Sequence, residues 1–211
     1  MTLRPWARRI AVGATSAAAL VALAVPAEAA APATTSTAAT TAVTAAADVD
    51  YATWQRDCQA VMDQALPYLK QRIADARPGE KQAIVFDIDN TTLETDFGFS
   101  FPQPANRPAL RVAQYAQDHG VALFFVTARP GIIAGVTDFN LEHVGYEVSG
   151  LYVRGFLDLF KNVADYKTAQ RVDIEKRGYT IIANIGNSAT DLSGGHAEKT
   201  YKLPDYDGQL S

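Results

Sequence analysis

The sequence has one cysteine, Cys58, among its 211 residues, so no disulfide can form within the chain. Cys58 falls on the apolar face of an expected helix, which favours a buried thiol over a reactive one. Basic residues are not in excess either, since 19 Lys and Arg stand against 23 Asp and Glu. The net charge of −4 and the lack of a basic stripe argue against a nucleic-acid polymer as a partner. Packing and bound ligands must therefore hold the folded domain together.

Long hydrophobic runs are missing except near the N-terminus, where residues 10–25 form an apolar stretch. Three arginines precede this stretch, and Ala27-Glu28-Ala29 then fits a small-x-small cleavage site. Because the stretch is short and rich in alanine, a cleaved signal peptide over residues 1–29 is favoured over a stable membrane anchor. Cys58 lies far beyond the cleavage site, so it is not a lipid-attachment cysteine. The sequence predicts a secreted protein, and the Arg8-Arg9 pair leaves both Sec and Tat export open.

Large apolar residues are missing from residues 30–47, which are almost entirely Ala and Thr. Such a segment cannot offset the entropy lost on ordering, so it is predicted to be a disordered tether. We expect one folded domain over residues 48–211, opening with a helical segment, residues 48–78, in which apolar residues recur at three- and four-residue steps. Asp50 could cap this helix, and Pro67 would kink it or start a second helix.

Short apolar segments alternate with amphipathic segments from residue 82 onward. The expected strands are 83–86, 121–126, 151–153, 179–185 and 200–203, and the expected helices are 108–119, 131–144 and 165–176. Continuous apolar strands separated by helices predict an α/β fold, a Rossmann-like three-layer α/β/α sandwich with a mainly parallel sheet. Sites in such folds lie beyond the C-terminal ends of the strands.

The first expected strand runs directly into two carboxylates, Asp87 and Asp89, followed by Asn90 and two threonines. Two carboxylates beside a buried strand are costly unless a metal or charged partners offset them. An isolated Asp-x-Asp triplet is usually a surface turn, but an apolar strand that leads straight into it favours a site.

Three further polar groups follow in chain order. Thr127 ends the second strand and could be a plain helix cap or a phosphate ligand. Lys167 lies near a helix start, where the helix dipole disfavours it, so it is either a solvated lysine or a partner of a buried anion. Asn187 and Asp191 follow the fourth strand, where they are either turn residues or ligands that complete a magnesium site. The joint pattern favours phosphate chemistry over four separate coincidences.

This pattern resembles the haloacid dehalogenase (HAD) superfamily in its phosphatase branch. Its four motifs match, in order, Asp87-Ile88-Asp89-Asn90-Thr91, Thr127, Lys167 and the run from Gly186 to Asp191. Within the superfamily, the chain resembles the secreted acid phosphatases of subfamily IIIB, which are similar to plant vegetative storage proteins and bacterial class C acid phosphatases. The resemblance covers about residues 50–205.

The resemblance implies a role for each matched residue. The nucleophile would be Asp87, which forms an aspartyl-phosphate, and Asp89 would be the general acid and base. The phosphoryl group would be held by Thr127 and the backbone N–H of Ala128, and Lys167 would neutralise charge. The Mg²⁺ ligands would be Asp87, the backbone carbonyl of Asp89, and Asn187, with support from Asp191.

Asn187 departs from the family pattern, which usually has Asp at this position. An amide keeps a ligand oxygen but removes a negative charge, so we expect weaker Mg²⁺ binding than with Asp, or a larger share for Asp191. Asn187→Asp is therefore expected to tighten Mg²⁺ binding. The change also keeps open a catalytically weak phosphate-binding, metal-binding or storage protein of the same fold.

The gaps between the motifs leave room for only a small cap insert, so we expect an open site that takes small phosphate monoesters, nucleotides among them. Phe97, Phe99 and Phe101 could form an apolar rim for the leaving group, or they could fold a short insert onto the core. A phosphotransferase that passes the phosphate to another alcohol is a further alternative, because the aspartyl-phosphate is common to both reactions.

Overall fold

A computed structural model describes residues 49–210. The predicted signal peptide and tether, residues 1–47, lie outside the described residues. The strands are β1 (Lys81–Phe86), β2 (Ala122–Pro130), β3 (Gly150–Arg154), β4 (Tyr179–Gly186) and β5 (Thr200–Lys202). The helices are α1 (Tyr51–Ala74), α2 (Arg107–Asp118), α3 (Ala134–His143), α4 (Val163–Lys176) and α5 (Ala189–Leu192), with 3₁₀ turns η1 (Gly131–Ile133) and η2 (Phe156–Phe160). No helix among residues 49–210 has the length and apolarity to cross a bilayer.

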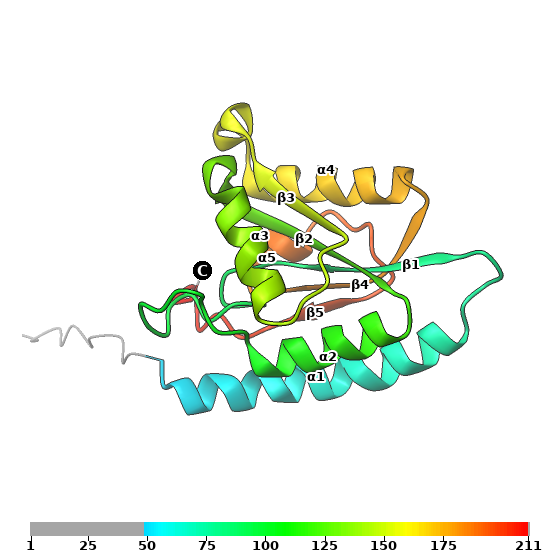
Figure 1. The fold of residues 1–211 in the computed structure, drawn as a ribbon, viewed down its shortest axis with the longest axis horizontal. Coiled ribbons are helices and arrows are strands. Elements are labelled where there is room, and N and C mark those ends of the chain that lie inside the picture. Colours follow the sequence, from blue (N-terminus) through cyan, green and yellow to red (C-terminus); the bar gives the residue numbers. More distant parts are fainter. Residues whose placement is uncertain (1–48, 211) are drawn as a thin grey trace, which may run out of the picture. The chain divides into compact units, whose positions relative to one another are not determined.

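The five strands form one parallel sheet in the order β3-β2-β1-β4-β5 (Figure 1). The first strand therefore lies at the centre, with β2 and β4 on either side. The predicted α/β fold with a parallel sheet is confirmed. Because all five strands run the same way, their C-terminal ends meet at one edge of the sheet.

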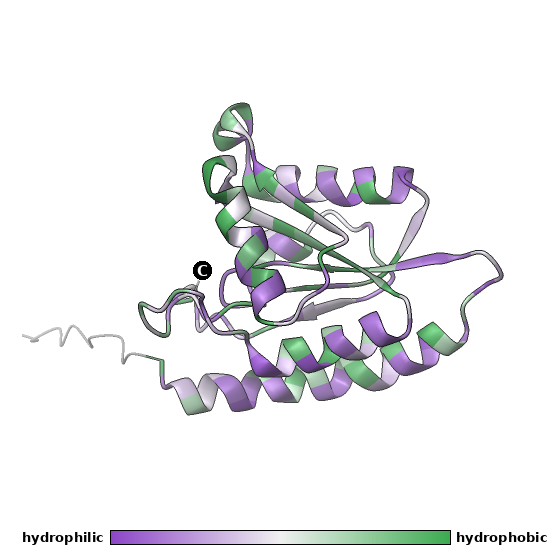
Figure 2. Cartoon of the chain, viewed as in Figure 1, coloured by the Kyte–Doolittle hydropathy of each residue, from purple (hydrophilic) through white to green (hydrophobic). Residues whose placement is uncertain are grey.

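Helices cover both faces of this sheet. On one face, alternate strand residues such as Ile84 and Phe125 share a core with α1, α2 and α3. On the other face, their neighbours Val85 and Phe124 pack with α4. Figure 2 shows the resulting apolar central strands between helices of mixed character. Burial on both faces explains why the strands are continuously apolar.

The N-terminal helix α1 lies along α2 (Figure 1). Its first turn is capped by Asp50, whose carboxylate accepts a 2.8 Å hydrogen bond from the backbone N–H of Thr53, as predicted. The helix continues through Pro67, so the prediction of a second helix starting there is wrong. Buried Ala65 and Leu69 flank the exposed proline, and their packing holds the helix together across the lost hydrogen bond.

Helix α4 begins at Val163, two residues before the predicted start. The cause is Asn162, whose side-chain oxygen accepts from the backbone N–H groups of Ala164, at 2.9 Å, and Asp165. This start places Lys167 in the second turn of the helix rather than at its N-terminus.

Candidate active site

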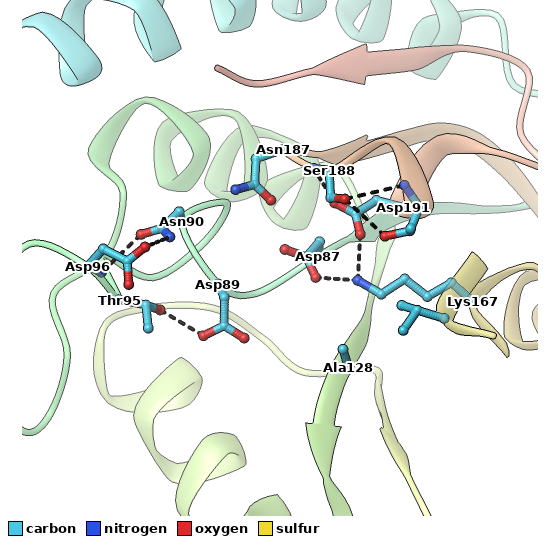
Figure 3. Close-up of a pocket in the computed structure, with 12 residues that line it drawn as sticks. Asp87, Asp89, Asn90, Thr95, Asp96, Ala128, Lys167, Asn187, Ser188 and Asp191 are labelled. Carbon is cyan, nitrogen blue, oxygen red and sulfur yellow. Dashed lines mark hydrogen bonds and ion pairs between the residues drawn. The ribbon is translucent and has the colours of Figure 1, made fainter. Parts of the chain in front are cut away.

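A cavity of about 460 Å³ lies at the C-terminal edge of the sheet. Its walls come from the loops after β1 and β4, the end of β2, and the first turns of α4 and α5 (Figure 3). The lining residues include Asp87, Asp89, Lys167, Asn187 and Asp191. Segments about 100 residues apart in sequence thus meet here, as expected for adjacent parallel strands.

The loop after β1 turns tightly on its own backbone directly beyond the strand. The backbone N–H of Asp87 continues the ladder with Ile185 of β4 at 2.9 Å, so this carboxylate is fixed at the sheet edge and is only 6% exposed. The N–H groups of Thr91, Thr92 and Leu93 then all donate to the carbonyl of Ile88 at 3.0–3.2 Å. This arrangement is a buried loop rather than the alternative surface turn.

Lys167 joins two carboxylates inside the cavity (Figure 3). Its Nζ lies 2.6 Å from Oδ1 of Asp87 and 2.5 Å from Oδ1 of Asp191. The lysine is 3% exposed, so the alternative of a solvated surface lysine is wrong. Burial alone would lower the pKa of Lys167, but the charges of the two carboxylates outweigh burial and raise it. The ammonium group therefore stays charged.

The charge balance at Asp87 is incomplete. Burial raises the pKa of Asp87 above its ordinary value, and the positive charge of Lys167 offsets this only in part because Asp191 opposes it. A cation that entered the cavity would stabilise the ionised carboxylate.

Asp89 has a different partner, Arg129, which the sequence analysis missed. The Nη2 and Nε atoms of Arg129 lie 2.7 and 3.1 Å from Oδ1 of Asp89, and Thr95 donates to the same oxygen at 2.8 Å. Burial would raise the pKa of Asp89, but the bonds and charge of Arg129 outweigh it and lower the pKa. The sequence feature that could have indicated Arg129 as a site residue is its position, two residues after Thr127.

Thr127 lies within β2, which extends to Pro130 rather than ending at residue 126 as predicted. No helix begins at Thr127, so the helix-cap alternative is wrong. Its hydroxyl is buried and accepts from the N–H of Arg129 at 3.1 Å. The next residue, Ala128, lines the cavity. The end of β2 therefore contributes backbone to the cavity and aims Arg129 at Asp89.

The loop after β4 fixes Asp191 from two sides. Its Oδ2 accepts from the N–H of Ser188 at 2.8 Å in a capping box, while its Oδ1 faces Lys167. Gly186 makes room for this arrangement, because a Cβ there would lie 2.4 Å from the Cβ of Asp191. The lysine contact of Asp191 was not predicted.

The oxygen atoms that line the cavity are of the type that a magnesium ion prefers. No three His, Cys, Asp or Glu side chains within residues 49–210 cluster as a metal site. The candidate set instead combines the carboxylates of Asp87 and Asp191 with the side-chain oxygen of Asn187 and the backbone carbonyl of Asp89. Hard oxygen donors of this kind suit Mg²⁺, and the raised pKa of Asp87 marks a carboxylate that lacks positive charge.

The three phenylalanines after the first motif separate in the structure. Phe97 stacks on Trp54 of α1 with ring centroids 4.3 Å apart, so it packs the insert onto the core. Phe101 stacks on Phe139 of α3 at 6.1 Å, and Phe99 is fully exposed. None of the three is among the residues that line the cavity. Only Phe99 and Phe101 remain available to a bound molecule.

The chain is similar to several known proteins. The chain is 29% identical over 175 residues to a stem 28 kDa glycoprotein of Glycine max, covering 72% of the chain and 67% of that protein. It is 25% identical over 173 residues to acid phosphatase 1 of Solanum lycopersicum, again covering 72% and 67%. The fold matches the class C acid phosphatase of Bacillus anthracis with a TM-score of 0.55 at 17% identity, over 69% and 67% of the two chains.

The family model of the HAD superfamily, subfamily IIIB (acid phosphatase), matches residues 7–209. This range includes every residue of the cavity described above. The chain therefore belongs to the HAD superfamily, in its acid phosphatase subfamily IIIB.

Proposed function

We propose that the chain is a secreted, Mg²⁺-dependent phosphomonoesterase that works through an aspartyl-phosphate on Asp87. The observation that carries the proposal is the buried contact of Asp87 with Lys167 at 2.6 Å, with Asp89 in the same cavity. A second carboxylate two residues after the nucleophile supplies the proton transfers that phosphate-ester hydrolysis needs.

In the proposed reaction, an oxygen of Asp87 attacks phosphorus and the ester oxygen leaves with a proton from Asp89. Asp89 then takes a proton from water, which attacks the aspartyl-phosphate and releases phosphate. Lys167 neutralises charge on Asp87 and on the phosphoryl oxygens, while Thr127 and the N–H of Ala128 orient the phosphoryl group. Magnesium, held by Asp87, Asp89, Asn187 and Asp191, would supply charge neutralisation and alignment.

The protein's own groups shift the pKa values of the two carboxylates in directions opposite to those that this reaction needs. The nucleophile must be ionised, yet burial raises the pKa of Asp87. The general acid must carry a proton, yet Arg129 holds the pKa of Asp89 below its ordinary value. Metal binding would favour the ionised form of Asp87, which moves the pair toward the required order. We therefore propose that the site with magnesium bound is the active one.

The proposed substrates are small phosphate monoesters, nucleotides among them, because the cavity is about 460 Å³ and residues 49–210 contain no large cap. The contact of Phe101 with Phe139 makes an exposed aromatic pair on the insert side of the site. Together with Phe99, this pair is the proposed rim for an aromatic leaving group. Export would follow from the predicted signal peptide, residues 1–29.

The test is phosphate release from p-nitrophenyl phosphate by residues 48–211, with and without Mg²⁺, beside an Asp87→Asn variant. We expect Mg²⁺-dependent release that the variant loses. Added glycerol tests the phosphotransferase alternative, which would yield glycerol phosphate in place of part of the inorganic phosphate. No release across pH 4–9 would contradict the proposal and favour a binding or storage protein.

A further inference from the structure

The backbone of the C-terminal segment reaches the wall of the candidate active site. The carbonyl oxygen of Leu210 accepts hydrogen bonds from the Nδ2 atoms of two asparagines, Asn187 at 2.5 Å and Asn90 at 3.0 Å. Both asparagines are 2% exposed and both line the cavity. One carbonyl thus ties the loop after β1 to the loop after β4.

The segment that presents this carbonyl is anchored in the core. Leu203 and Leu210 are buried with the residues of α1, and the N–H of Leu203 bonds to Gly186 at 2.8 Å. Between them, the N–H of Leu210 donates to the carbonyl of Asp205 at 3.1 Å, closing a turn. The hydroxyl of Tyr206 bonds to Asp57 of α1 at 2.9 Å. The Leu210 carbonyl therefore has a fixed position.

A carbonyl oxygen can only accept, so the atom of Asn187 that faces Leu210 must be the amide nitrogen. The amide is planar, and its oxygen must then point the other way. There Oδ1 lies 3.4 Å from the hydroxyl of Thr91, beside Asp87 in the cavity (Figure 3). The C-terminal turn thereby decides which atom of Asn187 a metal would meet.

We propose that residues 205–210 are a positioning element for Asn187, which they hold with its oxygen toward the magnesium site. This inference rests on the proposed metal site. It also gives a physical reason for an amide rather than a carboxylate at this position. An aspartate at this position would set an acceptor against the Leu210 carbonyl, and the buried pair would repel.

Asn90, in the loop after β1, also holds the Leu210 carbonyl in place. Its Nδ2 bonds to both Leu210 and the carboxylate of Asp96, at 3.0 and 2.7 Å, and its Oδ1 accepts from the N–H of Asp96. The Leu210 carbonyl therefore meets two donors, and a second buried amide remains to hold the turn when Asn187 is changed. The expected effect of changing Asn187 is local loosening rather than unfolding.

A metal-free experiment tests the contact first. Hydrogen exchange of residues 203–210 is measured in the protein, in Asn187→Asp, and in Asn162→Asp as a matched control. The side chain of Asn162 only accepts in its cap, so a carboxylate is tolerated there. We expect exchange about tenfold faster in Asn187→Asp alone, from a lost hydrogen bond and the added repulsion. Unchanged exchange in Asn187→Asp would overturn the proposal.

A titration with Mg²⁺ tests the positioning itself. Calorimetry compares the chain and a form ending at Pro204, each with and without the Asn187→Asp substitution. Removing the turn should weaken binding about tenfold when Asn187 is present, a typical cost for losing a group that orients a ligand. In the Asn187→Asp background, removing the turn should not weaken Mg²⁺ binding, because a carboxylate offers an oxygen whichever way it turns. Equal losses in both backgrounds would overturn the proposal.

The two experiments also separate this proposal from the proposed function. If the unchanged chain bound no Mg²⁺, the proposed metal site would be wrong. The exchange experiment would still decide whether Leu210 orients Asn187. If the shortened form did not fold, Leu210→Ala would replace it, since that change loosens the anchor and keeps the chain intact.

Discussion

Arg129 sets the charge of the candidate general acid, and it is the residue that most changes the view taken from the sequence. Its guanidinium contacts both carboxylate oxygens of Asp89. The proton that Asp89 would deliver is therefore held less tightly than on an ordinary carboxyl group. Lower pH restores that proton, which is consistent with an enzyme that works in acid.

Arg129→Gln should shift the pH dependence of activity upward. Loss of the cation raises the pKa of Asp89, so the protonated acid persists to higher pH and the alkaline limb of kcat/KM moves to higher pH. The rate at the optimum should fall as well, since Arg129 also holds the side chain of Asp89 in place through two of its nitrogens. Arg129→Lys is the control that keeps the charge. An alkaline limb that stayed in place or moved to lower pH in Arg129→Gln would contradict the assignment of Asp89 as general acid.

Gly186→Ala should destabilise the protein through Asp191. The added Cβ would lie 2.4 Å from the Cβ and 2.5 Å from Oδ2 of Asp191, so the loop after β4 must shift. Overpacking of this kind costs about 1–3 kcal/mol. Denaturant unfolding measures the loss, with Gly135→Ala as a control because no atom lies within 4 Å of its added Cβ. Equal stability of the two variants would show that the loop accommodates the methyl group.

At the residue scale, the sequence predicted which side chains gather but not how they pair. Asp87 and Asp89 were found because they follow a strand whose end lies at the edge where a parallel sheet has its sites, and Lys167 was found because a lysine near a helix start is unusual. The contact of Lys167 with Asp191 depends on the start of α4 and on the capping box after β4, which sequence spacing does not reveal. The contact of Asn187 with Leu210 depends on a turn that no motif marks.

At the scale of elements, the phenylalanines of the insert after β1 divide into one that packs on the core and two that are exposed. Phe97 packs against α1, whereas Phe101 and Phe99 are exposed. Phe97→Ala should lower stability by about 1–2 kcal/mol through lost burial and stacking. It should not change the preference between a nucleotide and a small sugar phosphate.

Replacing Phe99 and Phe101 together with Ala should have the opposite effect. Stability should change little, since both rings are exposed, while kcat/KM should fall more for the nucleotide than for the sugar phosphate. The comparison of the two substrates is the measurement, and Phe97→Ala is its control. Equal losses of kcat/KM on both substrates would contradict the proposal that Phe99 and Phe101 form a rim for the leaving group.

The elements themselves were largely predictable, since buried parallel strands and amphipathic helices have distinct patterns. The errors lie where a side chain or neighbouring packing overrides the local signal. Helix α1 passes through Pro67 because its buried face holds on both sides of the proline. Helix α4 starts early because of the Asn162 cap, and β2 extends past Thr127 into the site.

At the scale of the whole molecule, metal binding and pH should act together on stability. The pKa of Asp87 is raised in the folded, metal-free protein, so its buried charge costs stability at neutral pH. That cost is relieved as the pH falls through the folded pKa. Magnesium would relieve the same cost at neutral pH, in competition with the proton.

We therefore expect Mg²⁺ to raise the melting temperature more at pH 7 than at pH 5. At a hundredfold excess over its Kd, a ligand of the folded state adds about 2.7 kcal/mol. Thermal unfolding with and without Mg²⁺ at both pH values measures the difference, and Asp87→Asn should remove most of it. A larger shift at pH 5 would contradict the assignment of Asp87 as a metal ligand.

Asp87 is proposed to take the phosphoryl group, and trapping the aspartyl-phosphate is the decisive experiment. The protein is mixed with Mg²⁺ and a phosphate monoester, quenched in acid within the first turnovers, digested, and mapped by mass spectrometry. We expect one acid-stable, alkali-labile phosphoryl group on the peptide that contains Asp87, and none in Asp87→Asn. Phosphate release without any adduct on Asp87, or with the adduct on another residue, would show that Asp87 is not the nucleophile.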